Sequence, residues 1–461
     1  MSHSMPLGSF LARLLAGLAA ASLLLAQPVV SQSLLRDAET EALLADMSRD
    51  IIVAAGLSPR NVRVVLINDG SINAFVAGGQ IVYMHSGLLD AATSANEVQG
   101  VIAHEIGHIV GGHVPLQDQA MKPVMGISLV SLLLGVAAIA AGAGEAGAGI
   151  LAAGQRAAMG RYLAFTRVQE SSADAAGARF LNGAGVSGKG FLAFFKKLEN
   201  LEYRYGVEQG DGSFERTHPL NAERIAALTQ TLTRSEAWAK PLDPALEARF
   251  KRVQAKLRGY VNEPAATLRL YPPTDRSVAA LTARAYAYHK SGYPEQAAAE
   301  ATALAKAAPD DPYVLELQGQ VMLESGKPKE ALAPLREATL RTNSQPLIAT
   351  TFGHALLATD DRAHLDEAER VLRQAVARDD DNPWAWMQLG TVYERKGDEP
   401  RTALATAERA NLTGDARTAL VSAQRAMAGL PQGSRDWIRA QDIVLVSQTA
   451  VEELRRRERR R

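Results

Sequence analysis

The chain has 461 residues, too many for one compact core, so two or three domains are expected. Its 50 basic and 50 acidic residues cancel, and without a global positive field no nucleic-acid partner is expected. The absence of cysteine excludes disulfides and thiolate metal sites, so any zinc ligands must be histidines and carboxylates.

Residues 1–31 are typical of an export signal. Arg13 precedes an apolar run over residues 14–26, and small residues follow at positions 29 and 31, where cleavage is expected. A membrane anchor is the alternative, although the run is short for a span. The mature chain is therefore predicted to begin near Gln32 and to act in the periplasm.

A helix and a small sheet are predicted next. Residues 34–55 have helical spacing and end at Gly56, and residues 61–69 alternate like a strand. In "INAFVAGGQIVYMHSGLL", the pair Gly78-Gly79 separates two apolar runs, a pattern that indicates a β-hairpin.

The first run of this hairpin is the candidate substrate-binding strand, with residues Asn73, Ala74, Phe75 and Val76. An unpaired strand edge can bind an extended peptide through backbone hydrogen bonds, and such binding depends little on the sequence of the peptide. An ordinary interior strand is the alternative.

The stretch "HEIGH" places His104 and His108 four residues apart, on a helix that a capping box of Ser94 and Glu97 should begin. Residues four apart project from one helical face, so both imidazoles can reach one Zn²⁺. Glu105 would lie beside the metal, as the base that takes a proton from water. A histidine pair without a metal is the alternative.

A catalytic zinc requires a third protein ligand. His113 stands five residues after His108, off the ligand face, so a structural or solvent-facing role is expected for it. In "RVQESSADAAG", Glu170 and Asp174 share one helical face, among alanines that permit close packing on the His104 helix. Glu170 is therefore the candidate third ligand, and Asp174 the acceptor of a hydrogen bond from a ligand imidazole. An exposed acid pair is the alternative.

Residues 124–144 carry no charge, which on length alone permits a transmembrane helix. Because glycine and alanine dominate, we expect an apolar loop or helical hairpin beside the active site, packed on the domain or in peripheral contact with a membrane. A buried core helix and an integral membrane protease are the alternatives.

The motif "THPLNAERI" adds two candidates. His218 precedes a proline on a predicted loop, where it could donate a hydrogen bond to the oxyanion or act as a fourth ligand that blocks the water site. Arg224 could pair with an acid near the metal or steady the intermediate. A plain structural role is the alternative for both.

Beyond residue 274 the sequence is repetitive. Small residues at matching positions stand 34, 34 and then 37 residues apart, the last interval including a three-residue insertion: Ala285, Gly319, Gly353 and Gly390. A helix-turn-helix period of 34 residues predicts tetratricopeptide repeats over residues 274–448, after a linker at 239–273 and before a basic tail at 449–461.

Residues 34–228 resemble the family of zinc metallopeptidases that includes the CAAX prenyl protease and the bacterial heat-shock membrane protease. The resemblance rests on "NAFVAGGQIVYMHSGLL", "HEIGH", "RVQESSADAAG" and "THPLNAERI". It implies zinc ligands at His104, His108 and Glu170, with Glu105 as general base. The family usually has a second Glu where Ser172 stands, at a position that is not a ligand.

The expected architecture is mainly α: a zincin-like α+β domain of the gluzincin type over residues 32–238, with a small sheet and an active-site helix, then an α-solenoid of repeats. The resemblance implies an exported endopeptidase with one Zn²⁺ per chain that hydrolyses misfolded or stalled clients in outer-membrane protein quality control. The repeats would bind clients or the outer-membrane protein assembly machinery and add chaperone-like activity. A repeat scaffold or chaperone with little proteolysis is the alternative.

Overall fold

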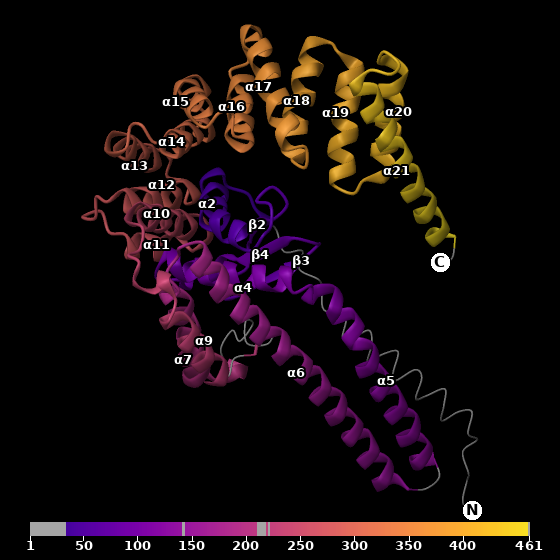
Figure 1. The fold of residues 1–461 in the computed structure, drawn as a ribbon. Coiled ribbons are helices and arrows are strands. Elements are labelled where there is room, and N and C mark those ends of the chain that lie inside the picture. Colours follow the sequence, from indigo (N-terminus) through magenta and orange to yellow (C-terminus); the bar gives the residue numbers. More distant parts are fainter. Residues whose placement is uncertain (1–33, 141–142, 210–217, 220–221, 460–461) are drawn as a thin grey trace, which may run out of the picture.

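The computed structural model describes residues 34–140, 143–209, 218–219 and 222–459, so the predicted export signal lies outside the described residues. Figure 1 shows a part that contains the sheet, an arched row of helices beside it, and a long helical hairpin that projects away from both. The described chain is mainly helical, as expected from the sequence.

The sheet part is built from the first half of the chain. Its strands and the helices packed with them are β1 (Leu34–Leu35), α2 (Ala38–Ala54), β2 (Arg63–Ile67), β3 (Ala74–Ala77), β4 (Ile81–His85), α3 (Ser86–Ala91), α4 (Ala95–Val110), α7 (Lys189–Gln209) and α9 (Ala222–Thr233). The strand order is β1-β2-β4-β3, with β2 parallel and β3 antiparallel to β4. The predicted hairpin is confirmed, and β3 lies at an edge of the sheet rather than in its interior.

Helix α4 lies at the centre of the hydrophobic core. Ser94 caps it by accepting a hydrogen bond from the Glu97 amide, and nearly all its residues are buried. A Cβ on Gly107 would lie 2.7 Å from the carbonyl oxygen of Ala173 on α6 (Gly144–Gly183). Glycine at this position lets α4 and α6 approach closely, which brings the "HEIGH" and "RVQESSADAAG" segments together.

The apolar segment forms a helical hairpin of α5 (His113–Ala140) and the first part of α6. Within the described chain, the stretch His113–Ile139 is long and apolar enough to cross a membrane, but only 6% of its most apolar window is buried. Large apolar side chains on it, such as Leu129 and Leu133, are more than half exposed. This exposure contradicts the buried-core-helix alternative. The segment forms a helical hairpin, one of the two expected forms, but it projects away from the sheet part.

The repeats form consecutive antiparallel helix pairs. These are α12 (Val278–Lys290) with α13 (Pro294–Ala307), α14 (Pro312–Glu324) with α15 (Pro328–Arg341), α16 (Pro346–Ala358) with α17 (Leu365–Arg378), and α18 (Pro383–Lys396) with α19 (Glu399–Leu412). A Cβ on Gly319 would lie 2.4 Å from Leu335, and one on Gly353 2.5 Å from Leu372, so the repeated glycines make room for a leucine of the partner helix.

Residues 239–273 differ from the expected connection. They form α10 (Pro244–Val261) and α11 (Pro264–Leu270), and α10 buries Phe250 and Val253 in the same core as α4. The apolar face of α10 explains the difference, because a helix that buries two large side chains joins the two parts as packed structure. At the other end, α20 (Ala416–Gly429) and α21 (Arg435–Glu458) follow the repeats, and the last turn of α21 contains Arg455, Arg456 and Arg457.

Candidate metal centre

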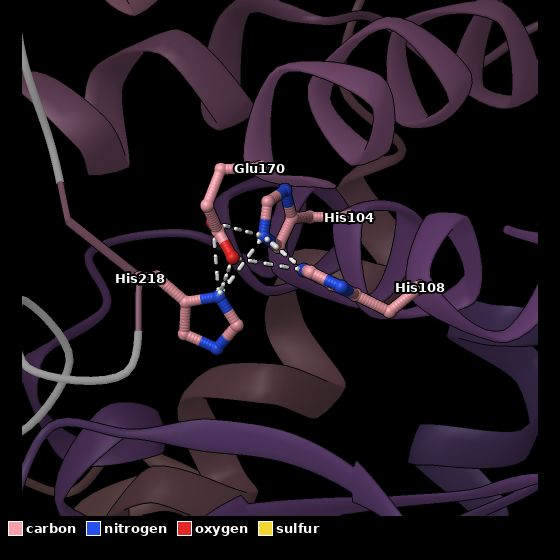
Figure 2. Close-up of side chains that lie close together, drawn as sticks. All are labelled: His104, His108, Glu170 and His218. Carbon is pink, nitrogen blue, oxygen red and sulfur yellow. Dashed lines mark hydrogen bonds and ion pairs between the residues drawn. The ribbon is translucent and has the colours of Figure 1, made fainter. Parts of the chain in front are cut away.

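Three side chains from two helices converge on one point (Figure 2). His104 Nε2 lies 3.1 Å from His108 Nε2, and the Glu170 oxygens lie 3.3 Å from His104 Nε2 and 3.4 Å from His108 Nε2. Tetrahedral zinc with bonds of about 2.0–2.1 Å separates its ligand atoms by about 3.4 Å. The spacing of these three donors therefore fits one zinc ion.

His218 completes the cluster. Its Nδ1 lies 3.3 Å from His104 Nε2 and 3.1 Å from both Glu170 oxygens, and the ligand atoms of all four residues lie within 4.8 Å of one another. On its other side, His218 Nε2 lies 3.2 Å from the carbonyl oxygen of Ala74. In this arrangement the ring takes the place of a fourth ligand, one of the two roles that the sequence left open.

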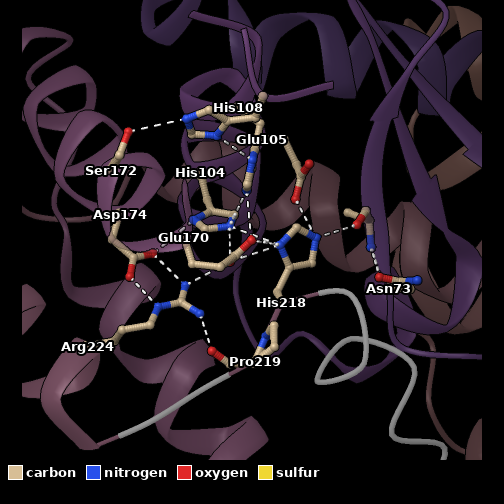
Figure 3. A network of polar contacts seen from close by, with 12 residues as sticks. Asn73, His104, Glu105, His108, Glu170, Ser172, Asp174, His218, Pro219 and Arg224 are labelled. Atoms are coloured by element: carbon tan, nitrogen blue, oxygen red, sulfur yellow. Dashed lines mark hydrogen bonds and ion pairs between the residues drawn. The ribbon is translucent and has the colours of Figure 1, made fainter. Parts of the chain in front are cut away.

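Glu105 lies next to the cluster without holding it together (Figure 3). Its side chain is fully buried, neither carboxylate oxygen has a hydrogen-bond partner, and Oε1 lies 3.5 Å from His218 Nε2. Burial raises the pKa of this carboxyl above its usual range. A buried acid with unused acceptor capacity beside three metal donors is suited to proton transfer.

Asp174 and Arg224 contact the metal-binding side chains and orient them. Asp174 Oδ1 lies 2.9 Å from His104 Nδ1, and Arg224 contacts Asp174 through Nε at 2.7 Å and Nη2 at 2.9 Å. Arg224 Nη2 also lies 3.1 Å from Glu170 Oε2. Asp174 thus lies beside a ligand imidazole, and Arg224 is paired with two acids near the metal position.

His113 has a more specific place than the sequence indicated. It is buried, with Nδ1 2.8 Å from His108 Nδ1, so it fixes the tautomer and orientation of that ligand ring. Gly111 makes room for it, since a Cβ there would lie 2.3 Å from His113 Nε2. The Gly-x-His pattern after "HEIGH" could have indicated this packing. Helix geometry did not predict it, because a helix that continued past residue 110 would turn His113 away from His108. The helix ends there, and Gly112 takes a positive φ of 61°.

The predicted substrate strand lies beside the centre. Asn73 is buried and accepts a hydrogen bond from the Ala74 amide, while Ala74 faces the cluster through its carbonyl. Phe75 stacks on Tyr83 of β4, and Val76 pairs with Val82. Of these four residues, Ala74 contacts the cluster through its carbonyl oxygen.

The charges of the cluster indicate that it needs a cation. Burial alone would lower the pKa of His104, but Asp174 and Glu170 raise it to about 10. Burial would raise the pKa of Glu170, but His218 and His104 hold it well below its usual range. The carboxylates thus favour positive charge at the point where the donors meet, which suits a divalent metal ion.

Two imidazoles and one glutamate as metal donors, with a second buried glutamate beside them, are the site of a zinc-type metallopeptidase. Residues 37–232 match the model "Peptidase family M48", so the chain contains an M48 peptidase domain, which confirms the family resemblance seen in its motifs. The buried cluster suits one metal ion per chain, as expected.

Three curated relatives extend the comparison. The "Putative beta-barrel assembly-enhancing protease" of Vibrio cholerae is 30% identical over 43% of this chain and 39% of its own length. "Metalloprotease LoiP" of Escherichia coli is 35% identical over 36% of this chain and 60% of its own. The "Beta-barrel assembly-enhancing protease" of Escherichia coli is 26% identical, and that alignment covers 76% of this chain and 71% of the relative. The chain thus spans less than two thirds of the first two relatives, and its similarity to the third includes the repeats.

Proposed function

We propose that this chain is an exported zinc endopeptidase that cleaves unfolded or misassembled proteins of the bacterial envelope. The observation that carries the proposal is the buried carboxylate of Glu105, which accepts no hydrogen bond among the described residues and lies beside the donors His104, His108 and Glu170.

The metal, when bound, supplies a Lewis acid that polarises the scissile carbonyl and makes water acidic. Glu105 accepts the proton of the attacking water and then donates it to the leaving amine nitrogen. Its raised pKa suits both steps, because the group must release the proton as readily as it takes it. Asp174, held by Arg224, orients His104 throughout.

The substrate would bind as an extended strand along β3. This strand has no neighbour on its outer side in the described sheet, and its Ala74 carbonyl already accepts a hydrogen bond beside the centre. Backbone pairing at this edge would place a peptide bond near Glu105 with little demand on sequence.

His218 would hold this centre closed at rest. Because His218 Nδ1 lies among the other donor atoms, its ring would exclude water from a bound metal, and its Nε2 contacts the Ala74 carbonyl oxygen that a substrate would use. A substrate or partner that draws His218 away would free both positions.

The wider role rests on the relatives. Two of them are named beta-barrel assembly-enhancing proteases, and we propose that this chain likewise acts in the periplasm, on clients of the outer-membrane protein assembly machinery that its repeats engage. The exposed apolar hairpin of α5 and α6 would provide a peripheral membrane contact.

Cleavage of a reduced, carboxymethylated protein by the zinc-loaded full chain tests the activity. Glu105→Gln is expected to lower the rate at least about 100-fold while zinc content stays at one per chain. Ser172→Ala, a change close to the cluster that removes no ligand, is the matched control. Equal rates for Glu105→Gln and the unmodified chain would rule out this mechanism.

The scaffold or chaperone alternative is supported by the share of the chain given to repeats. A cell whose only copy carries Glu105→Gln separates the two roles, because a scaffold keeps its function without the base. Full complementation by this variant would favour the scaffold, and loss of complementation the protease.

A further inference from the structure

A second pocket lies where the sheet part meets the repeats, away from the metal centre. It has a volume of about 410 Å³ and is lined by the start of α2, by α10, and by the first helices of successive repeats, α12, α14, α16 and α18. Figure 1 shows these repeat helices arching over α2 and β2. None of the elements that line the pocket carries a metal ligand.

Most charged groups around this pocket are paired. Lys256 on α10 contacts Asp37 and Glu39 at the beginning of α2, and Arg252 bridges Glu39 to Asp311. Because α2 also buries Ala38 against Ala338 and Ile348 of the repeats, these walls are held in place by packing as well as by charge.

Glu316 is the exception among the described residues that line the pocket. It lies on α14, is 9% exposed, and its Oε2 accepts no hydrogen bond. No described cation lies within ion-pair distance of it. A buried carboxyl without a partner costs free energy, which a positively charged group entering the pocket would recover.

The rest of the lining suits a long, positively charged side chain. Leu34, Leu257 and Leu347 offer apolar surface for an aliphatic stem. Tyr260 and Trp384 also line the pocket, and these residues, 56% and 46% exposed, offer aromatic rings on which a cation can stack.

We propose that this pocket binds a lysine or arginine side chain of an extended polypeptide, with Glu316 as its counter-ion. The occupant is a segment of a protein partner or client, because the volume exceeds that of one side chain and leaves room for flanking backbone. The site lies on the concave side of the repeats, where a bound chain would also touch the sheet part.

The groups that face Glu316 bear on its protonation. Burial raises its pKa to about 8, Asp37 and Glu39 on α2 add to the increase, and Lys256 on α10 opposes it. The carboxyl is therefore mostly protonated at neutral pH and ionises when a cation arrives, so binding releases a proton.

Binding to the full chain carrying Glu105→Gln, which prevents cleavage, tests the proposal independently of the peptidase function. The probes are two short, extended, fluorescein-labelled peptides, blocked at both ends, that differ only in a central lysine or norleucine. By fluorescence anisotropy the lysine peptide is expected to bind about tenfold more tightly, and added Glu316→Gln to abolish this difference. Glu324→Gln, on the same helix but outside the pocket, is the matched control.

Trp384→Ala provides a second test that leaves the buried acid intact, and it is expected to weaken the lysine peptide more than its norleucine twin. Calorimetry in two buffers of different ionisation enthalpy is expected to detect the released proton only when Glu316 is present. Equal affinity for both peptides, or a lysine preference that survives Glu316→Gln, would overturn the proposal. So would Glu316-dependent binding of spermidine without binding of the lysine peptide, because the site would then serve a free polyamine.

Discussion

Replacing His218 with alanine distinguishes the two roles open to this ring. In the structure, Nδ1 contacts Glu170 at 3.1 Å and Nε2 contacts the Ala74 carbonyl oxygen at 3.2 Å, with the ring 5% exposed. The neutral hydrogen bond is worth about 1 kcal/mol and the contact to a charged group about 1.5–3 kcal/mol. The conformational entropy lost on fixing the backbone at His218 opposes these two contributions, at about 1–2 kcal/mol per residue.

A net preference of about 1.4–2.8 kcal/mol leaves roughly 1–10% of molecules open. His218→Ala is therefore expected to raise kcat/KM on an unfolded protein substrate about 10- to 100-fold. The assay is initial cleavage rate at one zinc per chain, with His289→Ala in the repeats as control. If His218 instead served the oxyanion, its loss would lower kcat about 10²–10³-fold. A fall in rate, or no change, would refute the closed resting state.

Three further outcomes are expected. Asp174→Asn should weaken zinc binding about 10- to 100-fold in a competitive chelator titration, because His104 loses its charged partner; unchanged affinity would remove Asp174 from the site. Leu129→Glu with Leu133→Glu should abolish sedimentation with anionic vesicles and leave the melting temperature unchanged. The control Leu445→Glu, at another exposed leucine, should change neither the sedimentation nor the melting temperature. Folding raises the pKa of Glu316 from 4.5 to about 8, so between these pH values the folded state holds a proton that the unfolded state has lost. The free energy of unfolding should therefore fall with rising pH in this range, by about 1.4 kcal/mol per pH unit. Thermal unfolding across this range should lose that slope in Glu316→Gln, and persistence of the slope would contradict the assignment.

The sequence predicted the metal donors because they follow from helix geometry. His104 and His108 lie one turn apart on a helix whose cap is visible in the sequence, and the small residues around Glu170 showed which second helix could approach. The contact between His113 and His108 could not be predicted from helix geometry. It depends on the turn after α4, where Gly112 adopts a left-handed conformation. Local periodicity ends where a helix ends, and residues past that point are placed by tertiary packing.

The interface between the sheet part and the repeats could not be predicted from the sequence for a related reason. Residues 239–273 look like a charged linker, but two of their buried cations, Arg252 and Lys256, form ion pairs with the start of α2. Phe250 enters the core on the other side of the same helix. A sequence shows charge but not its partner, and Glu39 lies 213 positions from Arg252. For the same reason Glu316 reads as an ordinary surface acid of a repeat helix. Its distinction is a buried carboxyl that accepts no hydrogen bond at Oε2, in a pocket that residues of α2 and α10 also line.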